Sequence, residues 1–495
     1  MGTITWGSAR ARWVLLATVV GSGMGFLDGS VVGVALPAIG RDLDASMAGL
    51  QWVLNGYTLT LAALILISGS LGDRVGRRRV FLIGTVGFAL ASVLCALAPT
   101  IETLIAARVA QGVGAALLTP NSLALLEAEF TEDDSGRAIG AWSGLTGVAN
   151  AAGPFLGGWL VDIGDWRLIF LINVPLAALV VAVGLRHLPE SRPEEGGGRR
   201  LDWTGATLTV VSLGALTYAL TVAGEVGVSS WRFLVPAGTG VLVVLLFARS
   251  LRRSRHPLIP PRLFADRVFV AANLVTLGVY AALGVTFFLL VIQLQQVLGY
   301  SAVQAGVATL PITLLMLLLS ARSGDLARRI GPRAQMTAGP LVMALGLLLM
   351  GRIGPGSGYV TEVLPAVVLL GLGLAATVAP LTATALGAAG PADAGVASGV
   401  NNAVSRAAQL ASVAAVPALV GVAGDAYLDP ARFDAGFSSA MLVAAALAAS
   451  AGLVALLLIR RPRGEAEEGP SPYACGLDAA PLRRAPCQDP GRDAG

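Results

Sequence analysis

The sequence lacks lysine and carries little charge of either sign. Only 13% of its 495 residues are charged, and all 34 basic residues are arginine, whereas soluble domains are about a quarter charged. Hydrophobic residues make up 55% of the chain. A soluble core cannot bury that much apolar side chain, so the composition excludes an ordinary soluble domain and predicts a protein that crosses a membrane several times.

Cysteine and histidine are also scarce. Of the three cysteines, Cys95 lies in an apolar stretch, and Cys475 and Cys487 lie in a segment rich in proline and glycine near the C-terminus. No disulfide framework is therefore expected. The two histidines are too few for a metal site, and the sequence has no pattern typical of a catalytic triad or a phosphate-binding loop. We expect neither an enzyme nor a cofactor.

Long runs without charge fill most of the chain, and a helix of roughly 20 apolar residues spans a bilayer. Ten runs contain no charged residue: 45–72, 80–101, 109–126, 138–161, 168–185, 203–224, 233–248, 334–351, 363–392 and 435–459. Two more carry one charge each, 13–39 with Asp28 and 394–422 with Arg406, and the run 268–321 divides into two near residues 293–300. The sequence predicts an all-α polytopic membrane protein with fourteen transmembrane helices.

Arginine gathers at alternate ends of these runs. If the N-terminus is inside, 27 of the 34 arginines fall on cytoplasmic segments, which predicts that both termini are cytoplasmic. Arg10 and Arg12 before an apolar run imitate a signal peptide, but Asp28 interrupts the run, so we expect an uncleaved first helix. The arginines lie at membrane edges without an aromatic-plus-basic motif, so we expect no nucleic-acid partner.

Two charged linkers, 186–200 and 249–267, bracket a pair of predicted helices, with six helices before the pair and six after it. The predicted parts are an N-terminal six-helix bundle at 1–186, a linker with two additional transmembrane helices at 187–267, a C-terminal six-helix bundle at 268–461 and a disordered cytoplasmic tail at 462–495. The bundles share a repeat, GSLGDRVGRR at 69–78 and GDLARRIGPR at 324–333. Parallel repeats of this kind are typical of transporters that handle substrate between the two halves.

The first copy of the repeat combines glycines with charged residues and is a candidate gating loop. Its candidate residues are Gly69, Asp73, Arg74, Gly76, Arg77 and Arg78. The glycines allow a tight turn and close helix approach, and the aspartate can meet the positive N-terminus of a neighbouring helix. The alternative is a positively charged loop with no gating role. In the second copy Arg328 stands in the place of Asp73, so that half lacks the acidic group.

Asp28 and Arg108 are candidates for proton coupling. Asp28 lies about 15 residues into the first predicted helix, roughly 22 Å along it and near mid-bilayer, where a charge is costly unless it is hydrated, paired or protonated. Arg108 keeps its proton, and Asp28 is its natural partner within the same half. A fixed cation that favours ionisation of the aspartate in one conformation would couple proton release to transport. The alternative is a structural contact.

The fifth predicted helix contains GPFLGG at 153–158. Gly153, Gly157 and Gly158 let helix backbones pack closely, and Pro154 removes a backbone donor, so the segment is tightly packed and still bendable. Such a seam can seal a cavity against proton leak while the two halves rock. Polar candidates for a substrate cavity are Asn55, Trp142, Asn150, Asn273, Asn401 and Arg406. For the last two, helix packing is an equal alternative.

These motifs resemble the major facilitator superfamily, in particular its branch of fourteen-helix drug:proton antiporters, over about residues 12–461. The matching segments are LDGSVVGVALP at 27–37, GSLGDRVGRR at 69–78, LIAARVAQGVG at 104–114 and GPFLGG at 153–158, with support from WRLIFLINVP at 166–175 and GVNNAVSR at 399–406. The resemblance implies the major facilitator fold of two six-helix bundles plus two linker helices. It also implies that the loop at 69–78 latches the outward-open state and that 153–158 is an antiporter seam.

Together, the motifs and the resemblance predict a proton-coupled antiporter of the bacterial inner membrane. It would export small hydrophobic or amphiphilic molecules by alternating access, driven by the proton gradient. The expected partners are a small-molecule substrate, protons and the lipid bilayer, and the expected state is a monomer. Because the spans hold little acid besides Asp28, a strongly dicationic substrate is not favoured. The alternative on the same fold is an importer or facilitator of a small metabolite.

Overall fold

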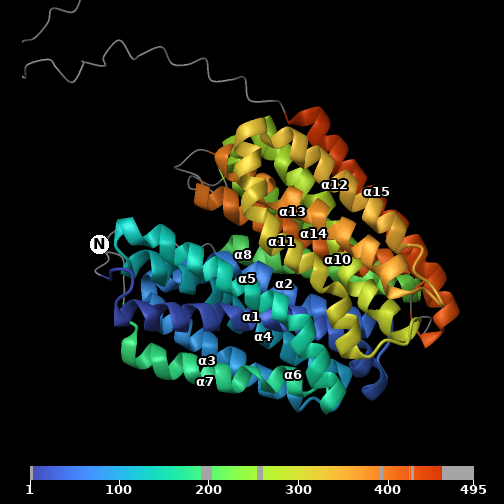
Figure 1. Cartoon of the computed structure of the whole chain (residues 1–495), viewed down its shortest axis with the longest axis horizontal. Coiled ribbons are helices and arrows are strands. Elements are labelled where there is room, and N and C mark those ends of the chain that lie inside the picture. The colour runs from blue at the N-terminus through green and yellow to red at the C-terminus, as the bar shows by residue number, and fades with distance from the viewer. Residues whose placement is uncertain are drawn as a thin grey trace, which may run out of the picture. The chain divides into compact units, whose positions relative to one another are not determined.

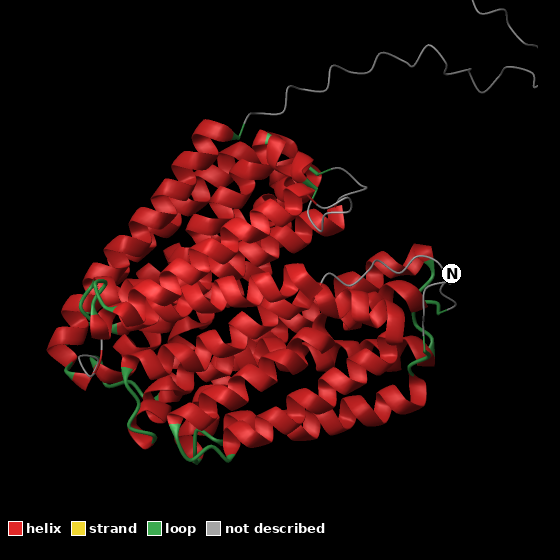
Figure 2. Ribbon diagram, turned by 180° about the vertical axis from the view of Figure 1, so that it is seen from behind, coloured by secondary structure: helices red, strands yellow, loops and turns green. Residues whose placement is uncertain are grey.

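The structure, a computed structural model, describes residues 4–190, 203–253, 260–389, 394–422, 424 and 428–459, and it is built of helices (Figures 1 and 2). Within these residues the α-helices are α1 (Ala9–Asp42), α2 (Met47–Val75), α3 (Arg77–Ala96), α4 (Ile101–Glu129), α5 (Glu132–Ile163), α6 (Leu168–Leu171), α7 (Asn173–His187), α8 (Trp203–Val226), α9 (Trp231–Arg253), α10 (Arg267–Gln296), α11 (Ala302–Ile330), α12 (Pro332–Met350), α13 (Leu364–Gly387), α14 (Ala394–Leu419) and α15 (Pro430–Leu458). A 3-10 helix (Pro261–Ala265) precedes α10, and a π-helical turn (Tyr359–Val363) precedes α13. β pairing in the described part of the chain is limited to one bridge between Ile4 and Phe130.

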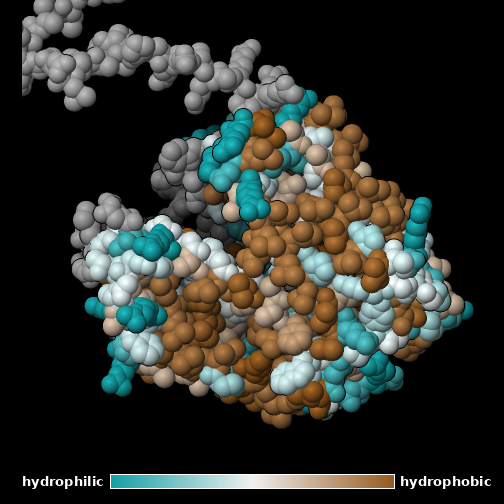
Figure 3. Space-filling model, in the orientation of Figure 1, coloured by the Kyte–Doolittle hydropathy of each residue, from teal (hydrophilic) through white to brown (hydrophobic). Residues whose placement is uncertain are grey.

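Eleven helices of the described residues are long and apolar enough to cross a membrane. Their outer faces expose large apolar side chains, such as Leu90 on α3 and Leu318 on α11. Apolar side chains cover much of the surface seen in Figure 3, with hydrophilic ones gathered at the ends of helices. Patches of this size are unfavourable in water but suit contact with lipid. The chain is therefore an all-helical, polytopic membrane protein.

Helix bounds follow from local sequence signals. Ser8, Ser46, Thr100 and Ser301 each accept a hydrogen bond from a backbone N–H of the helix that they precede, which satisfies a donor that has no intrahelical partner. The predicted helix at 168–185 differs, because the structure divides it between α6 and α7. Pro175 explains the break, since it has no N–H for the carbonyl four residues earlier and its ring crowds that carbonyl.

The two halves that carry the sequence repeat also pack their helices in the same way. In the first half α1 packs on α5, and α2 and α3 pack on α4; in the second half α10 packs on α14, and α11 and α12 pack on α13. Gly76 and Gly331 are the single residues that link α2 to α3 and α11 to α12, with φ of +114° and +83°. Because these φ values favour glycine, both copies of the repeat keep glycine at the turn.

The two halves meet mainly through α5 with α11 and α2 with α14, and α1 makes smaller contacts with α10 and α11. α8 packs against both α2 and α14, and α9 packs on α8. Residues Met1–Arg460 form one compact unit. The predicted tail at 462–495 lies outside the described residues, as do positions 191–202 and 254–259 of the predicted linker.

Candidate functional site

The structure brings Asp28 on α1 and Arg108 on α4 into contact inside the first half. The Arg108 side chain is fully buried and Asp28 is 1% exposed. Arg108 Nη1 donates to Asp28 Oδ2, and Arg108 Nε donates to the carbonyl of Val53 on α2 at 3.0 Å. A buried guanidinium needs acceptors of this kind, because isolated charge is strongly disfavoured away from water. The ion pair therefore ties three helices together.

Two amide side chains complete the surroundings of Asp28. Gln111 Nε2 donates to Asp28 Oδ1 at 2.8 Å, and Asn173 Nδ2 donates to the same oxygen at 3.3 Å. Both amides also donate to Ser92 Oγ on α3. Each of these neighbours therefore donates to the carboxyl group of Asp28.

Gln111 and Asn173 were missed as site residues, although both lie in segments that carry motifs. Gln111 follows Arg108 by three residues, which places the two side chains on one face of α4; Arg108 Nη1 also donates to Gln111 Oε1 at 2.6 Å. Asn173 is the first residue of α7, so the break before Pro175 positions its amide. The helical spacing from Arg108 could have indicated that Gln111 belongs to this site. The position of Asn173 beside Asp28 is seen only in the tertiary structure.

Aromatic rings enclose the guanidinium of Arg108. Its central carbon lies 4.4 Å from the centroid of the Tyr57 ring and 5.8 Å from that of Phe170, which is the range of cation–π attraction. The Tyr57 hydroxyl donates to the carbonyl of Gly25 at 3.1 Å. Arg108 Nη2 is buried and has no hydrogen-bond partner among the described residues. The two N–H donors of Nη2 are therefore unused among the described residues.

The predicted seam lies where α5 crosses helices of both halves. A Cβ on Gly157 would lie 2.8 Å from Val31 Cγ1 and 3.1 Å from Val31 Cα on α1, and a Cβ on Gly153 would meet Ser30. A Cβ on Gly158 would lie 2.6 Å from Val303 Cα on α11. Glycine is thus needed on both sides of α5, because real Cβ atoms cannot approach backbone so closely.

Pro154 and Asp162 extend this contact along α5. A Cβ on Gly306 of α11 would meet the carbonyl oxygen of Pro154. One turn after the seam, Asp162 Oδ1 accepts from the backbone N–H of Ala302 at 3.1 Å and Oδ2 from that of Val303 at 3.0 Å. Asp162 is not among the site residues predicted from the sequence. Its position, one turn after GPFLGG on the same helix, is the feature that could have indicated it.

Other hydrogen bonds between the halves lie at the same end of the bundles. Gln51 Nε2, near the start of α2, donates to the carbonyl of Val413 on α14 at 2.8 Å. Gln295 Nε2, at the end of α10, donates to the carbonyl of Val34 on α1 at 2.8 Å. Because α1, α5 and α10 end here and α2 and α11 begin here, these bonds join the halves at one membrane edge.

The charged residues of the loop at 69–78 bind within their own half. Asp73 accepts from Arg77 Nε at 3.1 Å and Nη2 at 2.9 Å, and Arg77 Nη1 donates to the carbonyl of Ala124 on α4 at 2.9 Å. Arg78 Nη2 donates to the carbonyl of Leu185 on α7 at 2.6 Å. Asp73, in the last turn of α2, is therefore paired with the first residue of α3.

The remaining loop residues have different surroundings. Gly76 has positive φ, and a Cβ there would also meet the Glu190 carboxylate. Gly69 lies within α2 with open space beside it, and Arg74 is exposed in the last turn of that helix. A side chain is consequently excluded at Gly76 and is sterically allowed at Gly69.

The residues predicted for the cavity have different hydrogen-bond surroundings. Asn401 on α14 donates to Thr276 Oγ1 at 2.7 Å and to Asn273 Oδ1 at 3.3 Å, so these amides tie α14 to α10. Asn55 Nδ2 and Trp142 Nε1 are buried donors without partners in the described part of the chain, and Asn150 is exposed.

Arg406 lies on α14, which packs on α2 of the other half. Its guanidinium lies near the side chains of Tyr57 and Tyr280. It is half-buried, and it makes no side-chain hydrogen bond or ion pair with a residue that the structure describes. An unpaired cation therefore lies where the halves meet, close to the ring that stacks on Arg108.

Comparison with known proteins agrees with this architecture. The family model described as Major Facilitator Superfamily matches residues 18–413. The multidrug resistance protein Stp of Mycobacterium tuberculosis (strain CDC 1551 / Oshkosh) is 38% identical over 390 residues, 79% of this chain and 72% of that protein. The puromycin resistance protein pur8 of Streptomyces alboniger is 37% identical over 433 residues, 85% and 84% of the two chains.

Solved structures show the same fold. A bacterial homologue of the human lysosomal transporter Spinster superposes with a TM-score of 0.63 at 16% identity, covering 91% of this chain and 97% of that one. The match of the family model, the identity to these relatives and the repeated helix packing agree, and the chain belongs to the Major Facilitator Superfamily.

Proposed function

We propose that the chain is a proton-coupled antiporter that exports small hydrophobic or amphiphilic molecules, in the fourteen-helix drug:proton branch of its superfamily. The observation that carries the proposal is the buried contact between Asp28 and Arg108 within spanning helices, because an acid at that depth is suited to carry a proton. Relatives named as puromycin resistance, cephamycin export, and tetracenomycin C resistance and export proteins support outward transport.

The fourteen spans of this proposal are the eleven apolar helices together with α5, α9 and α14. α5 and α14 form the contacts between the halves, where small and polar residues are expected in place of lipid-facing ones. The arginine distribution supports cytoplasmic termini in a bacterial inner membrane. In this orientation the end that carries Asp162 faces outward, and the protein acts as a monomer.

Asp28 is the proposed proton carrier, and Arg108 is its partner. The present arrangement supplies donors from Arg108, Gln111 and Asn173, which favours the ionised carboxylate. A movement of α1 against α4 that lengthens the ion pair leaves the carboxylate poorly solvated and favours proton uptake. Return of the guanidinium favours proton release. When the protein alternates between the two arrangements, Asp28 takes up and releases one proton in each transport cycle.

Alternating access follows from the contacts of α5 in the same proposal. With the outer end joined by Asp162, Gln51 and Gln295, the present conformation opens toward the cytoplasm. In the opposite conformation these bonds break, and the loop at 69–78 closes the cytoplasmic end. The close packing of the seam excludes protons from the outer end while the cytoplasmic end is open.

Arg406 is the proposed contact for polar groups of the substrate. Its guanidinium, which is unpaired among the described residues, favours molecules that carry an acidic or electron-rich group on an apolar body. A dication would meet repulsion from this residue. We therefore propose neutral and acidic amphiphiles as the preferred substrates.

An importer or facilitator of a small metabolite is the alternative, and the direction of transport separates the two. In inverted vesicles with an acidic lumen, an antiporter accumulates puromycin and loses this accumulation when a protonophore is added. Uptake that is indifferent to both the pH gradient and the protonophore would instead identify a facilitator. The same vesicles can be tested with a panel of antibiotics and dyes to define the substrates.

A further inference from the structure

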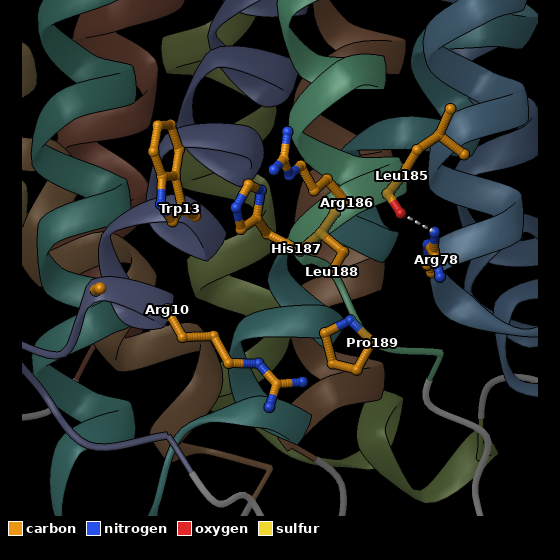
Figure 4. Close-up of a pocket in the computed structure, with 9 residues that line it drawn as sticks. Arg10, Trp13, Arg78, Leu185, Arg186, His187, Leu188 and Pro189 are labelled. Atoms are coloured by element: carbon orange, nitrogen blue, oxygen red, sulfur yellow. Dashed lines mark hydrogen bonds between the residues drawn. The ribbon is translucent and has the colours of Figure 1, made fainter.

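A separate pocket lies at the membrane edge opposite Asp162. It has a volume of about 550 Å³ and lies where α1 and α3 begin and α7 ends (Figure 4). Its walls are formed by Ala9, Arg10, Trp13, Arg78, Leu185, Arg186, His187, Leu188 and Pro189. No motif accounts for this pocket, and its residues take no part in the proposed transport steps, apart from Arg78 of the loop.

The pocket is rich in unused positive charge. Arg10 and Arg186 are exposed and make no side-chain hydrogen bond or ion pair with any described residue. His187 Nδ1 is buried and has no hydrogen-bond partner within the described ranges. Of the nearby acids, Glu190 pairs with Arg79 at 3.4 Å, and Glu129 interacts with Arg10. The pocket therefore presents more cation than its surroundings neutralise.

An aromatic pair forms one wall of the pocket. The rings of Trp13 and His187 stack with centroids 4.8 Å apart and planes inclined by 19°, and Figure 4 shows them side by side. The indole of Trp13 is 40% exposed. Tryptophan in this position is typical of the boundary between lipid headgroups and acyl chains. The pocket thus lies at headgroup depth.

An apolar surface leads away from the pocket along α3 and α7, which pack on each other. Its exposed side chains are Ile83, Leu90, Leu94, Leu179 and Leu185. A free phosphate ion would use the arginines alone, whereas a lipid would use both the cationic pocket and this apolar surface. The combination favours a lipid.

We propose that this pocket binds the phosphate headgroup of an anionic phospholipid, whose acyl chains lie along α3 and α7. Arg10 and Arg186 contact the phosphate, and Trp13 packs against the glycerol region. This site is independent of the proposed export activity, because it requires only the first half and a membrane. Basic pockets between spanning helices bind anionic headgroups in this manner. Since the headgroup bridges α1 and α7, its binding stabilises the first half.

The test uses the full-length protein purified in a neutral detergent. Native mass spectrometry and thermal unfolding are followed with dioleoyl phosphatidylglycerol, with dioleoyl phosphatidylcholine and with inorganic phosphate. We expect retention and stabilisation by phosphatidylglycerol, and little effect of the other two. The double variant Arg10→Gln/Arg186→Gln should bind phosphatidylglycerol roughly 30-fold more weakly, because each arginine near an anionic lipid surface contributes about fivefold to binding.

A matched control is Arg328→Gln/Arg329→Gln, which removes two exposed arginines from the end of α11, away from the pocket. This variant should bind phosphatidylglycerol in preference to phosphatidylcholine, as the parent does. Thermal unfolding without lipid checks that all three proteins are folded. Equal preference for phosphatidylglycerol in the parent and the pocket variant would overturn the proposal, and stabilisation by inorganic phosphate alone would replace the lipid with a free anion.

Discussion

The carboxylate of Asp162 at the end of α5 accepts a hydrogen bond from the backbone N–H of Ala302, the first residue of α11, at 3.1 Å. One half of the protein thereby caps a helix of the other half. The Ser301 hydroxyl donates to the same carboxylate at 2.7 Å. An acid at a helix N-terminus stabilises it by about 0.5–2 kcal/mol, so Asp162 contributes directly to holding the halves together at this edge.

Asp162→Asn should loosen this contact, because the amide keeps one acceptor and loses the charge. We expect the population that is open at this edge to rise by about 2- to 30-fold. Spin labels at Ile163 and Val307, both exposed, report the distance by pulsed electron resonance. Asp165→Asn is the control, since Asp165 pairs with Arg167 and not with α11. Identical distance distributions in parent and Asp162→Asn would rule out a gating role.

Asp28→Asn should abolish pH-driven export while the protein still inserts into the membrane. The amide keeps the size of the side chain and removes the titratable group, and it leaves Arg108 buried without an anion. Breaking a buried pair costs about 3–5 kcal/mol, so the melting temperature should also fall. Transport of puromycin in inverted vesicles, normalised to the amount of protein, is the measurement. Normal pH-driven transport would contradict the assignment of Asp28.

The double variant Asp28→Asn/Arg108→Gln separates stability from coupling. It removes both buried charges, so we expect it to recover much of the lost thermal stability. Transport should remain absent, because no titratable group is restored. If the double variant regained pH-driven export, another residue would have to carry the proton.

Arg108→Lys should retain partial activity, whereas Arg108→Ala should retain almost none. Lysine keeps the charge but loses the planar group that reaches Asp28, Gln111 and Val53 at once. Without any cation at this position, Asp28 should hold its proton at neutral pH. The measurement is proton release on addition of substrate to purified protein. Release with the pH midpoint of the parent in Arg108→Ala would show that the two residues are uncoupled.

Gly157→Ala should impair transport and lower stability by about 1–3 kcal/mol, because its Cβ would press on the backbone of Val31. Gly147→Ala provides the matched control on α5, since a Cβ there meets open space. The control should keep full activity, because alanine also favours the helix. Proton leak through vesicles and thermal unfolding are the measurements. Equal behaviour of the two variants would refute a packing role for Gly157.

Arg406→Gln should change substrate preference without unfolding the protein, because its guanidinium has no ion pair to lose in the described part of the chain. We expect export of acidic amphiphiles to fall about tenfold or more relative to neutral ones. Competition between an acid and its methyl ester in inverted vesicles measures the ratio. A ratio equal to that of the parent would remove Arg406 from the substrate site.

The sequence by itself determined the helical, membrane-spanning class and the family. Whether a run of residues can span a membrane depends on the hydropathy of that run alone. Whether a turn can adopt a positive φ likewise depends on the residue at the turn, which is glycine in both copies of the repeat. Ser46 and Ser301 likewise start α2 and α11 through local hydrogen bonds. These features can therefore be predicted without knowing which helices are neighbours.

Only the tertiary structure decided which side chains meet. Asn173 reaches Asp28 because Pro175 interrupts the helix and α7 packs on α1, and Asp162 reaches α11 because the glycines bring α5 close. Asn401 on α14 donates to Asn273 on α10 because these two helices pack together. These contacts join segments far apart in the chain, so they depend on how helices pack against one another, which the local pattern of a sequence does not specify.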